Sequence, residues 1–375
     1  MVILSAREQL KLEILVKVMA GMMSSKTGAQ LLEVNGRTFR RYLKAYREKD
    51  VLSIKHGNGK KIPHNKTCAQ IKNAVLDLIK DKYFDFNILH LQEKLSEEGL
   101  KIKRETLRKW CHEIGVVKRS KRRRSHPRYH RERMSQAGMM IQFDGSHHKW
   151  FDGRESCLLA AIDDATNEVY AKFYEGETTF ACLDILKEMI SKKGCFKTLY
   201  VDKAGVYGGV KREGFSQVQR ALGELDIHTL FAHSPQAKGR VERLFNTLQD
   251  RLIAEMRLNK IRTMKQANDF LQNVYLPSHN AKFMVLPRNM QGLYRPIHPS
   301  YSIDEIFCMK EYRIIGNDHT ISWCNERYMI ANELKFSIAR QRLEIRLYSN
   351  KPWTCHFAGI ELKLVKVEKV KKLVA

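Results

Sequence analysis

From residue 139 to about residue 260 the sequence changes repeatedly between two apolar patterns, and this succession limits the fold most strongly. Short apolar runs predict buried strands, whereas apolar residues at helical spacing predict amphipathic helices. In chain order we expect strands at 139–143, 156–163 and 168–175, a helix at 179–194, a strand at 198–202, a helix at 214–224, a strand at 228–233 and a long helix from 238. The succession predicts a mixed α/β domain.

Two of the strands and the long helix each carry an acid at a defined place. Asp144 follows the first strand, which we expect to end at Phe143, Asp202 ends the fourth strand, and Glu242 lies in the first turn of the long helix. Each acid has an ordinary explanation, because Asp favours turns and an acid suits a helix N-terminus. Three antiparallel strands followed by these helices and strands are the element order of a ribonuclease-H-like core, which we place at 138–260.

Other polar residues nearby are weaker candidates. Asp163 and Asp164 fit the turn "DDAT", although Asp163 could also support a metal ligand from behind. His147 and His148 lack the i, i+4 helical spacing of paired metal ligands. We therefore assign His148 either to the edge of an active site or to a polar loop.

Four segments resemble a known family: 142–153 ("QFDGSHHKWFDG"), 156–166 ("SCLLAAIDDAT"), 199–203 ("LYVDK") and 233–249 ("HSPQAKGRVERLFNTLQ"). They resemble the integrase core of insertion-sequence transposases in the retroviral-integrase superfamily, most closely the ISNCY group, and the likeness extends over roughly residues 5–295. The resemblance implies that Asp144, Asp202 and Glu242 are catalytic. It also implies that they bind two Mg²⁺ ions, for which Mn²⁺ can substitute.

The implied chemistry is DNA strand transfer. Carboxylates suit Mg²⁺, and two such ions about 3.5–4 Å apart can activate a nucleophile and stabilise the leaving oxygen at phosphorus. The resemblance thus implies a DDE-type transposase that binds the terminal inverted repeats of its own element, releases 3′-hydroxyls and joins them to target DNA. We expect a homodimer or higher oligomer on the DNA ends. A catalytically silent regulator, or a nuclease of the same fold without joining activity, remains open as an alternative.

Positive charge is concentrated in the first third of the chain. Residues 1–137 hold 32 Lys and Arg against 14 Asp and Glu, a net +18 of the total +26. Such a surplus suits polyphosphate, because each neutralised phosphate releases counterions. A basic soluble surface or attraction to an anionic membrane is the alternative, but no amphipathic membrane helix accompanies the charge. We therefore expect double-stranded DNA as the partner, and no membrane.

Two helical units precede the core. Residues 1–56 begin with a capping box at Ser5 and end in a basic third helix after the turn Asn35-Gly36, which is typical of a helix-turn-helix domain. Residues 62–117 predict a second such unit, and the basic arm 118–137 is expected on phosphates or in a minor groove. The predicted DNA contacts are Arg37, Arg40, Arg41, Lys44, Arg104, Arg108, Lys121, Arg122, Arg123, Arg124, Arg240, Arg243 and Asn246. A three-helix bundle with solvated charges is the alternative for the first helical unit, and a plain flexible linker is the alternative for the basic arm.

The remaining sequence predicts a connecting segment at 261–300 and a small all-β, barrel-like domain at 301–375, where short strands alternate. The eight cysteines are scattered without metal-binding spacing, which predicts reduced thiols and no structural zinc. No apolar run of about 18 residues occurs, and charge comes too early for a signal peptide. We expect a bacterial cytoplasmic protein associated with the nucleoid.

Overall fold

A computed structural model of the protein describes residues 4–55, 66–116, 131–151, 153–202, 216–232, 238–332 and 336–367. Their contacts form two compact units, one up to Val75 and one from Leu76 onward. Lys121, Arg122, Arg123 and Arg124 of the expected basic arm lie outside the described residues, so their role stays a prediction. All eight cysteines are free, as predicted. Within the described ranges, no helix has both the length and the apolar character needed to cross a membrane.

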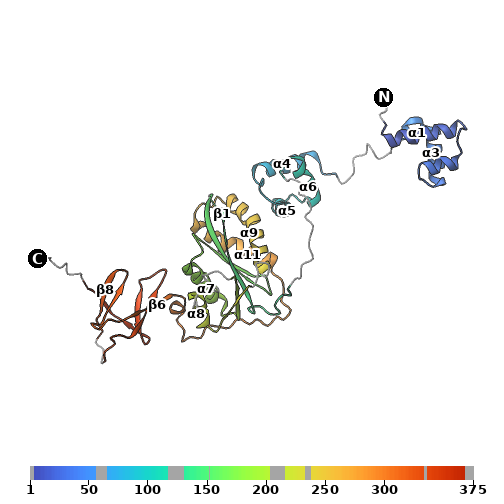
Figure 1. Ribbon diagram of the computed structural model, residues 1–375. Coiled ribbons are helices and arrows are strands. Elements are labelled where there is room, and N and C mark those ends of the chain that lie inside the picture. Colours follow the sequence, from blue (N-terminus) through green and yellow to red (C-terminus); the bar gives the residue numbers. More distant parts are fainter. Residues whose placement is uncertain are drawn as a thin grey trace. The chain divides into compact units, whose positions relative to one another are not determined.

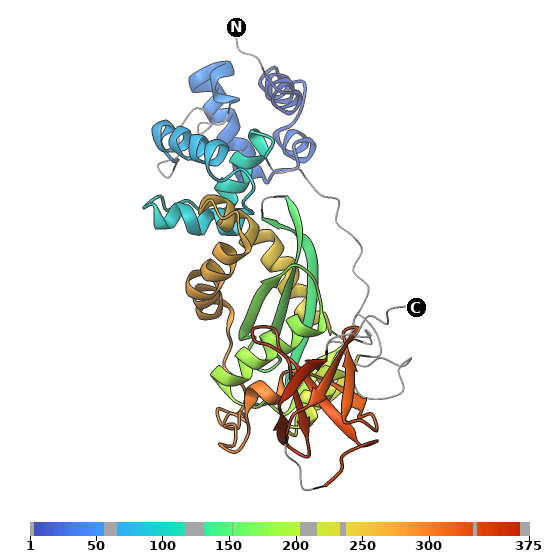
Figure 2. The same ribbon diagram turned by 90° about the vertical axis from the view of Figure 1, so that its left-hand side faces the viewer.

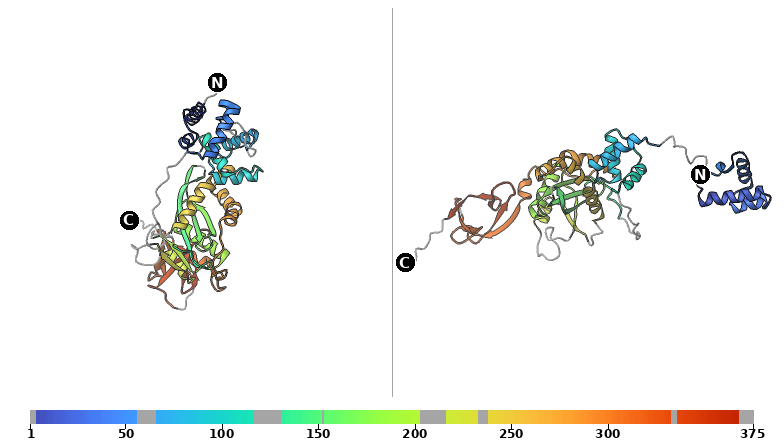
Figure 3. Two further views of the ribbon diagram at one scale, coloured as in Figure 1. Left: turned by 90° about the vertical axis from the view of Figure 1, so that its right-hand side faces the viewer. Right: turned by 90° about the horizontal axis from the view of Figure 1, so that it is seen from above.

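Three helices form a bundle within the first unit, and Figure 3 shows them in blue: α1 (Ala6–Met19), α2 (Ser25–Leu31) and α3 (Gly36–Lys49), followed by a 3₁₀ turn at Asp50–Ser53. The predicted capping box starts α1, since the backbone N–H of Ser5 donates to the Glu8 carboxylate at 2.8 Å. Asn35 caps α3 by accepting from the Thr38 N–H at 2.7 Å. The bundle encloses a small apolar core of Ile14, Leu15, Ala29, Phe39, Leu43 and Ile54.

The next helices are α4 (Ala69–Asp81), α5 (Ile88–Glu97) and α6 (Arg104–Glu113). Ion pairs attach α5 and the loop before it to the long helix α9 (Gly239–Leu258). Arg251 of α9 binds Glu93 at 2.8 Å, Glu255 binds His90 at 2.8 Å, and Arg257 binds Asp85 at 2.6 Å. Helix α5 and the loop before it therefore pack against the core.

A five-stranded sheet forms the centre of the second unit. Its strands are β1 (Ile141–Phe151), β2 (Arg154–Asp163), β3 (Val169–Tyr174), β4 (Thr198–Val201) and β5 (His228–Phe231), in the spatial order β3-β2-β1-β4-β5. The first three strands pair antiparallel, whereas β4 pairs parallel with both β1 and β5. The strand succession predicted from the sequence is confirmed.

Helices cover both faces of this sheet (Figure 1). One face buries an apolar cluster against α7 (Thr179–Lys193) and α8 (Gln217–Gly223). The other buries a second cluster against α9, α10 (Met264–Phe270) and the start of α11 (Leu276–Phe283), and Figure 2 shows α9 beside the strands. Because both faces of the sheet are buried around its second strand, β2 is continuously apolar from Cys157 to Ile162.

The segment after α9 protects the outer edge of the sheet. Asn268 and Asn280 each exchange two hydrogen bonds with the backbone of β3, at Phe173 and Val169 respectively. Gln272, in the π-helical turn Leu271–Tyr275 between α10 and α11, donates to the Ala171 carbonyl at 2.6 Å. An unpaired edge strand invites pairing with another chain, so these side-chain amides satisfy the free backbone groups of β3.

After the short helix α12 (Ile303–Ile306), the described residues of the C-terminal region form seven strands: β6 (Met309–Ile314), β7 (Thr320–Trp323), β8 (Glu326–Ile330), β9 (Arg342–Leu347), β10 (Thr354–Phe357), β11 (Ile360–Leu362) and β12 (Leu364–Val367). They form two sheets, ordered β11-β10-β9-β6 and β12-β8-β7, around one apolar core. The predicted short strands are present in two sheets; whether this region acts as a barrel-like domain stays a prediction.

Candidate active site

Asp144 lies within β1 and not at its end. The prediction that the strand stops at Phe143 is wrong, because β1 continues to Phe151 and Asp144 pairs with Ala160 of β2. On its other side, β1 pairs with β4 only at Ile141 and Gln142. The β1–β2 hairpin thus extends beyond β4, and Asp144 lies just past the point where β4 ends and Asp202 follows.

A buried lysine joins the two aspartates. The Nζ atom of Lys238 lies 2.9 Å from Oδ1 of Asp144 and 3.7 Å from Oδ2 of Asp202. Only 5% of the Lys238 side chain is exposed, against 22% for Asp144 and 47% for Asp202. The structure therefore brings two of the three predicted acids together around one positive charge.

The pair of carboxylates is electrostatically costly without a cation. Burial raises the pKa of Asp144 above its ordinary value, the Asp202 carboxylate acts in the same direction, and the Lys238 ammonium opposes both. The Lys238 contact is chiefly an ion pair, because its Nζ has no hydrogen bond of good geometry among the described residues. The pair needs positive charge, and Lys238 supplies one.

Glu242 follows Lys238 by four residues. Lys238 is the residue before α9, and Glu242 lies exposed in the first turn of that helix. Residues four positions apart lie on one side of a helix, about 5–6 Å apart at Cβ. This spacing predicts that Glu242 lies on the side of α9 nearest Lys238, and its place beside the two aspartates stays a prediction.

The first turn of α9 is held against β1 by buried contacts. Val241 is fully buried, and its N–H donates to Oε1 of Gln142 at 3.3 Å. Gln142 also donates to Asp164 at 2.7 Å, and further along α9 Gln249 donates to Ser146 at 3.1 Å. These bonds fix the start of α9 relative to the strand that carries Asp144.

Asp164 is the centre of a structural network. Its fully buried carboxylate accepts hydrogen bonds from Arg131, from Arg240 at 2.7 Å and from the Met134 N–H at 2.9 Å. Burial raises the pKa of Asp164, but these donors outweigh burial and hold it below its ordinary value. Its role is to anchor the segment before β1 and the start of α9.

Asp163 is equally accounted for by the turn. Its side chain accepts from the N–H groups of Gly138 at 2.7 Å and Ala165 at 2.9 Å, and from the Tyr294 hydroxyl at 3.0 Å. The interpretation of "DDAT" as a turn explains Asp163, which accepts from the Ala165 and Thr166 N–H groups of that turn, whereas the hydrogen-bond donors to the Asp164 carboxylate lie outside the turn.

His147 and His148 lie on β1 and not in a loop. Alternation along a strand places His148 on the same face as Asp144, four residues further along β1. The His148 ring packs edge-on against the Trp150 ring, with 5.6 Å between the ring centroids. His147 faces the other side with Cys157 and Glu177, and the ligand atoms of these three residues lie within 4.8 Å of one another. Burial, with Glu177 acting in the same direction, raises the pKa of the Cys157 thiol to about 12, which disfavours the thiolate that a metal needs.

The described candidates for DNA contact fall into two groups. Most are exposed on helix surfaces: Arg37, Arg40, Arg41 and Lys44 on α3, Arg104 and Arg108 on α6, and Arg243 and Asn246 on α9. Arg240 differs, because its side chain is 12% exposed and its guanidinium binds Asp164. Arg240 therefore has a structural role in addition to any contact with DNA.

Lys238 and Gln142 were not identified from the sequence. A signal existed for Lys238, because it precedes Glu242 by one helical turn and so shares its side of the helix. No local pattern marks Gln142, whose two partners lie 22 and 99 residues away along the chain.

Comparison with known proteins finds relatives along most of the chain, although no family model matches it. The protein named "Putative transposase y4bF" of Sinorhizobium fredii is 33% identical over 363 residues, covering 93% of this chain and 79% of that protein. The transposase for insertion sequence IS1202 of Streptococcus pneumoniae is 28% identical over 309 residues, covering 70% of this chain and 65% of that protein.

Solved structures with some likeness come from retroviruses. The simian T-cell lymphotropic virus intasome in complex with PP2A regulatory subunit B56 gamma has a TM-score of 0.37 and 16% identity, covering 72% of this chain and 94% of its own. The HTLV-2 integrase catalytic core domain in complex with magnesium has a TM-score of 0.30 and 16% identity, covering 36% of this chain and 82% of its own.

Proposed function

Because the chain belongs to the transposase family of these curated relatives, we propose that it is the DNA transposase of an insertion sequence. It binds the terminal inverted repeats of its own element, cuts to leave 3′-hydroxyls and joins them to target DNA. The observation that carries this proposal is the meeting of Asp144 and Asp202 at Lys238, one helical turn before Glu242.

The donor set fits hard divalent cations. Asp144, Asp202 and Glu242 offer only carboxylate oxygens, the ligands that Mg²⁺ and its substitute Mn²⁺ take. The buried ammonium of Lys238 shows that positive charge is stable between the two aspartates. When bound, two such ions supply activation of the attacking hydroxyl and stabilisation of the leaving oxygen. The chain's own residues orient this site, since Gln142 and Asp164 hold the start of α9 against β1.

DNA recognition belongs to the helical regions in this proposal. The first unit acts as a helix-turn-helix domain with α3 in the major groove, and α6 extends the contact. The net charge of +26 attracts DNA and keeps free protomers apart. Joining two element ends requires two active sites, so the working form is a homodimer or larger assembly on DNA.

The decisive experiment incubates the full chain with duplexes that carry its own element's ends, target plasmid and Mg²⁺. We expect cleaved 3′-hydroxyl ends and joined products, and EDTA should abolish both while DNA binding persists. Cleavage without joining would favour a nuclease. Binding without cleavage, in Mg²⁺ and in Mn²⁺, would favour a regulator.

Lys238→Met should reveal that lysine and metal neutralise the same carboxylates. Without metal we expect Lys238→Met to lower the free energy of unfolding by about 1–2 kcal/mol. This loss is small for a broken buried ion pair, because Asp202 is half exposed. Mg²⁺ should then raise the melting temperature of Lys238→Met more than that of the wild type, which thermal unfolding measures. The control is Lys265→Met, an exposed lysine on α10. Equal Mg²⁺ effects in the variant and the wild type would contradict this role.

A further inference from the structure

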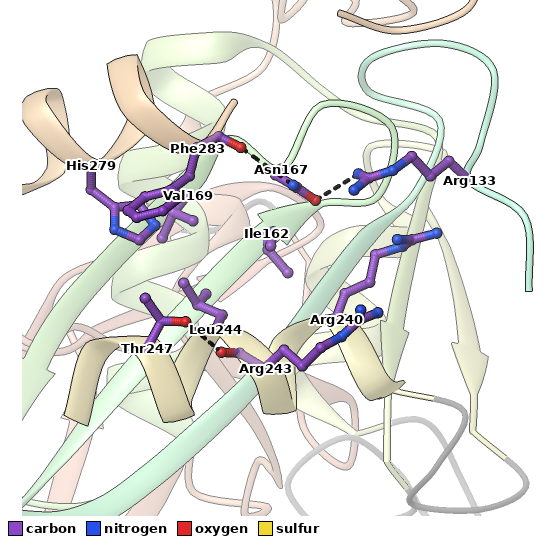
Figure 4. A pocket seen from close by; sticks show the side chains of 10 residues that line it. All are labelled: Arg133, Ile162, Asn167, Val169, Arg240, Arg243, Leu244, Thr247, His279 and Phe283. Carbon is purple, nitrogen blue, oxygen red and sulfur yellow. Dashed lines mark hydrogen bonds between the residues drawn. The ribbon is translucent and has the colours of Figure 1, made fainter. Parts of the chain in front are cut away.

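A pocket of about 220 Å³ opens beside α9, and we call it the arginine pocket. Four parts of the chain supply its walls: the segment before β1, the turn between β2 and β3 with the adjoining strand ends, one side of α9, and α11. Its lining residues are Arg133, Ile162, Asn167, Val169, Arg240, Arg243, Leu244, Thr247, His279 and Phe283. Figure 4 shows the three arginines on one side and His279 with Phe283 on the other.

The arginine side carries more positive charge than the described carboxylates around it neutralise. Arg133 donates to the Asn167 side chain at 2.6 Å, and Arg243 donates to the Gly239 carbonyl at 2.8 Å, both neutral acceptors. Asp164 is the single carboxylate that contacts these arginines among the described residues, and Arg131 shares it. Like charges held this close favour an anion between them. Burial lowers the pKa of Arg133, and Arg240 and Arg243 act in the same direction.

The opposite side is apolar and aromatic. Ile162, Val169 and Leu244 form its floor, and the rings of His279 and Phe283 lie 4.7 Å apart. His279 is only 6% exposed, and its Nδ1 has no hydrogen-bond partner among the described residues. Burial lowers the pKa of His279 to about 4, so its ring is neutral at physiological pH.

We propose that the arginine pocket holds one unstacked nucleotide of the DNA strand that is cut, a proposal that rests on the proposed function. Its phosphate lies against the arginines and its base lies on the apolar side with Phe283 and His279. Bases released from a duplex are held in this way, by stacking on aromatic rings and by arginine at the backbone. The volume, below the usual range of about 300–1,000 Å³ for small-molecule sites, suits a single base.

The location agrees with a role at the cleaved end. Arg240 and Arg243 lie in the same turns of α9 as Glu242 but on a different side of the helix, so the pocket and the proposed catalytic acid are neighbours across the start of α9. An end nucleotide held there is separated from its partner strand next to the site of cleavage. Pulling a base from the stack costs free energy, which is smallest when the base is already unpaired.

The test compares the affinity of the full chain, in EDTA, for fully paired element ends and for ends whose terminal nucleotides are already unpaired. We expect the wild type to prefer the unpaired ends by about tenfold. Thr247→Phe fills the pocket without changing charge and should abolish this preference, whereas Thr247→Ala, the matched control, should keep it. Arg243→Gln, at an exposed position, is a second variant that should weaken the preference if Thr247→Phe does not fold.

The outcomes separate this inference from the proposed function. The nucleotide pocket is overturned if the wild type does not prefer unpaired ends, or if Thr247→Phe or Arg243→Gln leaves that preference unchanged. This holds even if Mg²⁺-dependent joining occurs. A chain that prefers unpaired ends through the pocket but neither cuts nor joins in Mg²⁺ or Mn²⁺ overturns the catalytic proposal and leaves the pocket assignment standing.

Discussion

Replacing Glu242 with Gln should lower strand cleavage by about 1,000-fold or more, equivalent to at least about 4 kcal/mol of transition-state stabilisation. Gln preserves the size of the side chain but removes the negative charge that a divalent cation needs. Asp144→Asn and Asp202→Asn should act in the same way. Binding to element ends should persist in all three variants, because we assign affinity to basic surfaces away from these acids.

Two measurements on the same preparations check this expectation: the cleavage rate on an element-end duplex in Mg²⁺, and binding to that duplex in EDTA. The matched control is Asp269→Asn, which removes one exposed carboxylate from α10. Cleavage at the wild-type rate by any of the three variants would exclude that acid from the catalytic site. A variant that loses binding and cleavage together would indicate a structural role instead.

Changing Arg37, Arg40, Arg41 and Lys44 together to Ala should reduce the preference for element ends over random duplex by about 1,000-fold. All four side chains are exposed on α3, and Ala favours a helix, so the bundle around Phe39 and Leu43 should stay folded. Each lost phosphate contact also removes counterion release, and the slope of log affinity against log salt should fall by up to about four.

Fluorescence anisotropy over a range of salt concentrations measures both quantities. The control removes three exposed charges, Lys260→Ala and Arg262→Ala in the turn after α9 and Lys265→Ala on α10, and should leave the preference for element ends intact. If the α3 variant retains that preference, recognition lies in another part of the chain. The second helical region, with Arg104 and Arg108 on α6, would then be the next candidate.

Features that depend on nearby residues could be predicted from the sequence. The capping boxes, the helix starts and the succession of strands and helices follow from patterns spanning about one or two turns of chain. The start of α1 at Ser5 and the cap of α3 at Asn35 are of this kind. The order of Asp144, Asp202 and Glu242 is also a property of the sequence, and it led to the candidate site.

The length of β1 could not be predicted, because it depends on a partner. Its polar second half, which includes His147, His148 and Lys149, has no apolar run, yet β2 pairs with it up to His148 and again at Phe151. Cross-strand pairing and not local propensity decides where this strand ends. The position of Asp144 relative to Asp202 follows from that pairing and from the shorter β4.

The sequence by itself determined the kinds of secondary structure, the family resemblance and the order of the acids. Only the tertiary structure decided what neutralises them and what holds them: Lys238 lies against Asp144, 94 residues away in the chain, and Arg240 lies against Asp164, 76 residues away. The physical reason is that a buried charge is stable only beside a partner, and the fold chooses that partner among residues that no local pattern connects.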